Sequence, residues 1–85
     1  MSEQQQREQC RKETRAYLAE RAGLAFDSSA ITRGLRMRGG FQEADVRDAL
    51  NFLKGRGHVL AEPDGDGATL YWQITADGTL AYERS

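Results

Sequence analysis

The clearest periodic pattern of apolar and polar positions lies in the middle of the chain. Four apolar residues recur there at the helical spacings of three and four positions: Val46, Ala49, Leu50 and Leu53. This spacing predicts a helix over residues 42–54 whose apolar stripe faces the core. The opposite side of the helix carries Asp48 and Asn51, flanked by Arg47 and Phe52, so it presents a polar face to solvent.

A longer helical pattern stands at the start of the chain. Residues 3–22 are rich in Gln, Glu, Arg, Lys and Ala, which favour helices, and Gly23 is expected to end this helix. We expect residues 1–6 to fray. One stripe of the helix holds the residues that are expected to face the core: Cys10, Thr14, Tyr17, Leu18 and Ala22.

Between these two patterns we expect a short second helix of about two to three turns that reaches Met37. Three successive residues can cap its start with a side-chain oxygen: Asp27, Ser28 and Ser29. Its expected buried side holds Ala30, Ile31, Gly34 and Leu35. The pair Gly39-Gly40 breaks this helix, and Phe41 is expected to pack under the turn that follows, which is a helix-turn-helix spacing.

After Gly57 the pattern changes to the alternation that is typical of strands. Residues 58–62 and 69–75 predict two strands, and the Asp-Gly repeats between them suit a hairpin turn. One face of the second strand holds Leu70, Trp72 and Ile74. Tyr71 lies on the opposite face from Trp72, so one of these two rings is expected to pack on the helices and the other to be partly exposed.

A short closing helix is predicted over residues 76–84. Thr75 can cap it, and Leu80 and Ala81 are expected to face inward. Gly78 lies inside this helix, where glycine costs about 1 kcal/mol relative to alanine. The helix is therefore intrinsically weak.

The composition fits one folded domain over residues 1–85. The chain is 39% hydrophobic and has one cysteine, Cys10, so it supplies a core but neither an internal disulfide nor a cysteine-based zinc site. In a chain of 85 residues, a deep catalytic cavity would compete with that core. No apolar run reaches the roughly 18 residues that span a bilayer, and the polar first residues do not resemble a secretory signal. We therefore expect a cytoplasmic protein without membrane contact.

Charge is distributed unevenly although its formal sum is only -1. Residues 28–60 carry six basic and three acidic side chains, whereas residues 61–85 carry one and five. Phosphate binding depends on the local field of a surface, so a basic middle segment can bind nucleic acid in a nearly neutral protein. The alternative is that these charges lie on solvated faces of small helices.

The order of the predicted elements resembles the winged helix-turn-helix family, over nearly the whole chain. The matching segments are the turn at 39–41, the helical pattern at 44–53, the exit at 55–59 and the aromatic, Ile-Thr and glycine sequence at 71–78. The resemblance implies an α+β fold of three helices, a two-stranded hairpin wing and a short C-terminal helix. It also implies that the third helix enters the major groove of DNA, braced by the second, with the wing at phosphates or the minor groove.

The resemblance makes double-stranded DNA the leading expected partner and a small transcriptional regulator of bacterial or phage type the leading expected function. The residues expected to carry DNA binding are Arg33, Arg36, Arg38, Arg47, Asn51, Lys54 and Arg56. Asn51 has the amide that reads adenine, and Arg47 can reach guanine or a phosphate. The others would contact phosphates, which positions the protein without reading sequence.

Acidic residues weigh against this function. Glu43, Asp45 and Asp48 would approach the phosphate-lined groove, and the wing carries carboxylates where the family usually has basic residues. The alternative is a winged helix that binds protein, as an adaptor or assembly component, through these acidic surfaces. The long first helix and the closing helix could also join two copies of the chain in a homodimer.

No residue pattern indicates catalysis, so we expect no enzyme, no cofactor and no metal. His58 is the only histidine and has no second titratable group at a telling spacing. The stretch at 64–67 superficially resembles a calcium loop, but the twelfth position of such a loop would be Thr75, where a bidentate glutamate is needed.

Overall fold

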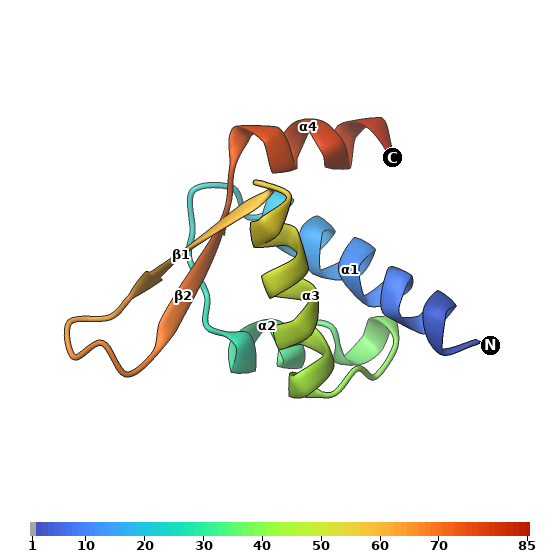
Figure 1. Ribbon diagram of the computed structural model, residues 1–85, viewed down its shortest axis with the longest axis horizontal. Helices are drawn as coiled ribbons and strands as arrows, with labels where there is room; N and C mark the ends of the chain where they lie inside the picture. Colours follow the sequence, from blue (N-terminus) through green and yellow to red (C-terminus); the bar gives the residue numbers. More distant parts are fainter. Residues whose placement is uncertain (1) are drawn as a thin grey trace.

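The computed structural model describes residues 2–85, which form four α-helices, one 3₁₀ turn and a two-stranded antiparallel hairpin (Figure 1). In chain order the elements are α1 (Glu3–Ala19), α2 (Ser28–Gly34), η1 (Arg36–Arg38), α3 (Glu43–Gly55), β1 (Val59–Pro63), β2 (Leu70–Ile74) and α4 (Ala76–Arg84). The predicted α+β class and the order of helices and hairpin are confirmed.

The first helix is shorter than predicted. It is helical from Glu3, because Ser2 and Gln5 form a capping box, and Met1 lies outside the described residues. The prediction over residues 3–22 is wrong at the far end, where α1 stops at Ala19. Ala22 is exposed rather than buried, so the core no longer supports a further turn.

The second helix also ends early. Asp27 is its cap, with a carboxylate oxygen that accepts from the Ala30 N–H at 2.7 Å. The prediction of one helix as far as Met37 is wrong, because α2 ends at Gly34 and the chain tightens into η1. Gly34 lies against the Tyr17 ring, which a side chain at this position would overlap. The two helices therefore approach closely at this point.

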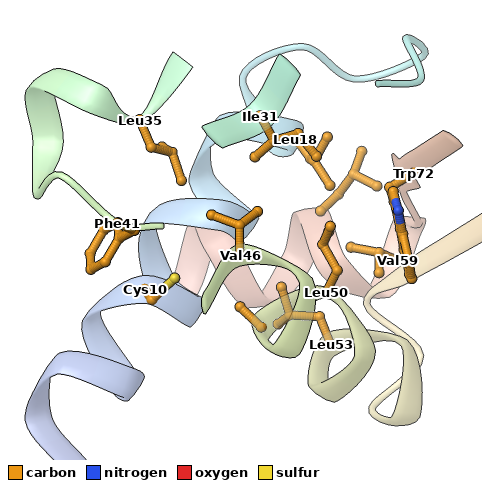
Figure 2. Packing of buried hydrophobic residues seen from close by; sticks show 12 residues of the cluster. Cys10, Leu18, Ile31, Leu35, Phe41, Val46, Leu50, Leu53, Val59 and Trp72 are labelled. Carbon is orange, nitrogen blue, oxygen red and sulfur yellow. The ribbon is translucent and has the colours of Figure 1, made fainter. Parts of the chain in front are cut away.

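The third helix places its predicted stripe in the core. Val46, Ala49, Leu50 and Leu53 are all buried. Figure 2 shows the side chains of α3 directed toward Leu18 of α1, Ile31 of α2 and Trp72 of β2. The core thus lies between α3 and the other elements, and α3 contributes more buried residues to it than any of them.

The hairpin packs on the helices at its base only. Trp72 is 3% exposed and Tyr71 is 37% exposed, as expected of residues on opposite faces. Phe26 pairs with Trp72 through two backbone hydrogen bonds of 2.8 and 3.0 Å, an isolated bridge that ties the segment before α2 to the two-stranded sheet. Leu70 shares the face of Trp72 but is 46% exposed, because the distal part of the hairpin extends away from the helices (Figure 1).

The closing helix has the predicted bounds, and Thr75 caps it by accepting from the Gly78 N–H at 3.0 Å. The expectation that Leu80 faces inward is wrong, since it is 46% exposed. The helix instead packs through Gly78, which is buried against the backbone carbonyl of His58. A side chain at this position would overlap that carbonyl.

Candidate nucleic-acid interface

The outer face of α3 is uncovered along its length. In Figure 1, α1 and the hairpin flank this helix and α4 lies beyond its C-terminal end. Arg47, Asp48 and Asn51 are exposed, as the sequence pattern predicted. A helix held to the core along one stripe, with the opposite side free, has the shape required to enter a groove of DNA.

Three of the expected DNA-binding residues share one line along α3. Arg47, Asn51 and Lys54 are all exposed and occur at i, i+4 and i+7, so they follow each other on one side of the helix. We call these three residues the α3 stripe. Their chemistry suits guanine or phosphate, adenine and phosphate respectively. The spacing is present in the sequence, and the structure adds that the segment is helical and that all three side chains are exposed.

Arg47 is held by an acidic neighbour on its own helix. Its guanidinium lies 2.9 Å from the Glu43 carboxylate, and both side chains are substantially exposed. Asp48, the next residue along the helix, forms no ion pair among residues 2–85. An exposed pair of this kind contributes only about 0.3–0.5 kcal/mol. Arg47 can therefore exchange Glu43 for a stronger partner.

The carboxylates at the start of α3 have local roles. Asp45 accepts from the Gln42 N–H at 3.1 Å as part of a capping box, and Glu43 holds Arg47. Only Asp48 remains on the outer face as an acidic side chain without a recorded partner in the described residues. Glu43 and Asp45 keep their negative charges, so all three carboxylates oppose the approach of DNA phosphates, and Asp48 does so without a local role in the helix.

The four remaining expected contacts occupy different places. Arg38 lies 3.4 Å from Glu13 and 3.6 Å from Glu20, so its charge is already balanced by α1. Arg33 donates to the Ser29 hydroxyl at 3.1 Å. Arg36, like Arg33, is exposed on the surface of the α2–η1 segment. Arg56 follows the last turn of α3 and turns toward Phe52, away from the α3 stripe.

The hairpin tip is acidic and has its own internal structure. One carboxylate oxygen of Asp64 accepts from the backbone N–H groups of Asp66 and Ala68 at 3.0 and 3.1 Å. This carboxylate stabilises the turn. Asp66 and Glu62 are exposed beside it, so the tip presents negative charge to any partner.

A second group of basic side chains was not predicted from the sequence. The Arg11 guanidinium lies 3.5 Å above the centre of the Phe52 ring, and the Arg56 guanidinium lies 5.8 Å from it. Arg15 and His58 lie beside them. The four-residue spacing of Arg11 and Arg15 placed them on one side of the first helix, but their contact with Phe52 depends on how α1 packs on α3.

Burial and nearby charges shift the pKa values of His58, at the entrance to the hairpin, and of Cys10, in α1. Burial lowers the pKa of His58 below its ordinary value, and the positive charges of Arg15 and Arg56 lower it further, while Asp77 opposes them. Burial raises the pKa of the Cys10 thiol, which therefore stays protonated at neutral pH. This places Cys10 among core residues, as its position in the first apolar stripe predicted.

Two general features of the described part of the chain bear on the class of site. No helix in residues 2–85 is both long and apolar enough to cross a bilayer. Across those residues, no three His, Cys, Asp or Glu side chains gather where they could hold a metal ion.

Comparisons with protein-family models, curated proteins and solved structures found no match to this chain.

Proposed function

We propose that this chain is a winged helix-turn-helix protein that binds double-stranded DNA as a small transcriptional regulator, with α3 in the major groove. The observation that carries this proposal is the α3 stripe, three groove-compatible side chains aligned on an uncovered helix face. It acts as a binding protein rather than as an enzyme.

The proposed contacts divide into reading and positioning. Asn51 lies in the middle of the stripe, where a carboxamide pairs with the edge of adenine. Arg47 releases Glu43 and reaches a neighbouring base or phosphate. Lys54, together with Arg33 and Arg36 near α2, contacts phosphates and holds the helix in register.

The hairpin has no phosphate contact in this proposal. Its tip carries Asp66 and Glu62, which phosphates would repel. The hairpin therefore lies outside the DNA, and α3 with the α2–η1 segment supplies the contacts. This is a departure from the basic wing that the family usually has.

A salt titration with variants tests the proposal. Binding of duplex DNA should show a log-log salt slope of several units, and Lys54→Ala should reduce it by about one unit. Asn51→Ala should instead lower the preference for the best sequence over random duplex while leaving the slope unchanged. Arg84→Ala, which removes an exposed charge from α4, is the matched control and should change neither. Absence of binding near physiological salt would refute DNA binding.

One observation favours protein binding as the second candidate function. Leu60 and Tyr71 are exposed on one face of the hairpin and Leu70 on the other, next to the acidic tip, and exposed aromatic and apolar residues are typical of protein interfaces. In that case Tyr71→Ser would abolish self-association or partner binding in sedimentation experiments, whereas the α3 variants would have no effect.

A further inference from the structure

A shallow depression lies between α1 and the C-terminal end of α3, apart from the α3 stripe. It has a volume of about 310 Å³. Its basic and aromatic lining consists of Arg11, Lys12, Arg15, Phe52, Arg56 and His58. We call this site the basic depression. Four of these side chains are cations, and Glu8 is the one carboxylate among the lining residues.

None of the four cations forms an ion pair with another described residue. The ion pairs formed within residues 2–85 involve only Arg21, Arg38 and Arg47 among the cations, and none lies in the basic depression. With Glu8 as the one carboxylate beside four cations, the depression keeps an excess of positive charge, and these like charges repel one another. An anion bound in the depression would relieve that repulsion.

Two of the arginines also have an unused hydrogen-bond donor. The Nε atoms of Arg11 and Arg15 are buried and have no hydrogen-bond partner. A buried donor without an acceptor costs about 1–3 kcal/mol. A rotation that turns either guanidinium toward a ligand oxygen would recover part of this free energy. These side chains therefore favour a ligand that is rich in acceptors.

Phe52 orients the guanidinium of Arg11 in the basic depression. Its ring is 38% exposed, and the Arg11 guanidinium lies over it at 3.5 Å. Stacking of this kind restricts the plane of the guanidinium, so less conformational freedom is lost when its fork binds two oxygens. The aromatic side chain thus organises a donor instead of filling the core.

We propose that the basic depression binds a phosphate group. Arginine forks match the tetrahedral oxygens of phosphate through paired hydrogen bonds, and Lys12 adds a mobile point charge. The depression is open to solvent, so it admits either a phosphate of the DNA backbone or the phosphate of a free small molecule. The site does not require α3 to enter a groove and stands apart from the proposed DNA contacts.

Inorganic phosphate titrated into ¹⁵N-labelled protein tests this site, with sodium chloride of equal ionic strength as the reference. Phosphate should shift the backbone amide signals of Phe52, Gly57 and His58 beyond the effect of chloride. Arg15→Gln should weaken phosphate binding about tenfold, the loss expected for one charge-assisted hydrogen bond. Arg84→Gln, on α4 outside the depression, should leave it unchanged.

Two results would overturn the proposal: equal shifts with phosphate and chloride, or equal phosphate affinity in Arg15→Gln and the unmodified chain. A thermal melt of each variant establishes that it is folded. Arg11→Gln is the second variant, with the same expected loss, if Arg15→Gln does not fold.

A duplex of roughly one helical turn distinguishes the two sources of phosphate. If the DNA backbone occupies the site, inorganic phosphate displaces the duplex and Arg15→Gln weakens duplex binding. If a free phosphorylated molecule occupies it, Arg15→Gln loses inorganic phosphate but retains the duplex. Lys54→Ala reports on the α3 stripe alone, so failure of DNA binding is separable from failure of this site.

Discussion

Two glycines of this chain lie where segments that are distant in the sequence approach each other too closely for a side chain. Gly78 shows this most clearly, because its sequence position suggested only a weak helix, whereas the structure shows a close approach to the His58 carbonyl. Gly34 is similar, since the Tyr17 ring occupies the space of a side chain. Neither contact is encoded in local periodicity, so neither could be predicted from the sequence.

Substitution of Gly78 by alanine separates helix propensity from packing. Propensity favours Gly78→Ala by about 1 kcal/mol, but overlap with a backbone carbonyl cannot be relieved by a side-chain rotation. We expect a net loss of about 1–2 kcal/mol of unfolding free energy in urea denaturation. Gly55→Ala is the control, because a methyl group there meets no atom within 4 Å, and it should be neutral or stabilising. Equal stability of the two variants would contradict the packing assignment.

His58 makes the folded state less stable as the pH falls. Its folded-state pKa is lowered by burial, by Arg15 of α1 and by Arg56 beyond α3, against Asp77 of α4. The unfolded chain therefore takes up a proton more readily as pH falls below about 6.5. We expect the melting temperature to fall further between about pH 7.5 and pH 5.5 in the unmodified chain than in His58→Gln. Parallel curves would show that His58 contributes nothing to this dependence.

The helices and strands were predicted most reliably where a single row of apolar residues determines which side is buried. The apolar stripe of α3 and the cap of α4 were confirmed, and the alternation in β2 was confirmed from Tyr71 to Ile74 but not at Leu70, which is exposed. The ends of α1 and α2 were not confirmed, because they are set by where the core stops. The three polar residues of the α3 stripe, Arg47, Asn51 and Lys54, were each predicted from the sequence. The basic depression was not, since it arises only when α1 packs on α3.

The outer face of α3 offers a prediction at the level of this helix. Among the described residues, Asp48 is the exposed carboxylate there that forms neither an ion pair nor a capping hydrogen bond, so its removal reduces repulsion from phosphates without disturbing the helix. Asp48→Asn should strengthen duplex binding about two- to fivefold, in keeping with the small energy of an exposed charge. Glu83→Gln, an equal charge change on α4, should have little effect when both are measured by fluorescence anisotropy. Unchanged affinity in Asp48→Asn would place DNA elsewhere on the molecule.

The whole molecule has an uneven charge distribution that its net charge of -1 conceals. The hairpin, with its acidic tip, extends to one side of α3, and α1 lies on the other side (Figure 1). The basic depression lies between α1 and the C-terminal end of α3. An extended polyanion that approaches this protein would be attracted at one side and repelled at the other. This asymmetry fixes the orientation of the encounter before any specific contact forms.

The short pairing of Phe26 with Trp72 has a consequence for self-assembly. It occupies the far edge of β2, so in the described chain the outer edge of β1 is the side left for strand addition by another polypeptide. That edge ends in Pro63, which has no amide hydrogen, and carries the charge of Glu62. These features oppose the stacking of several molecules into a fibre through the two-stranded sheet.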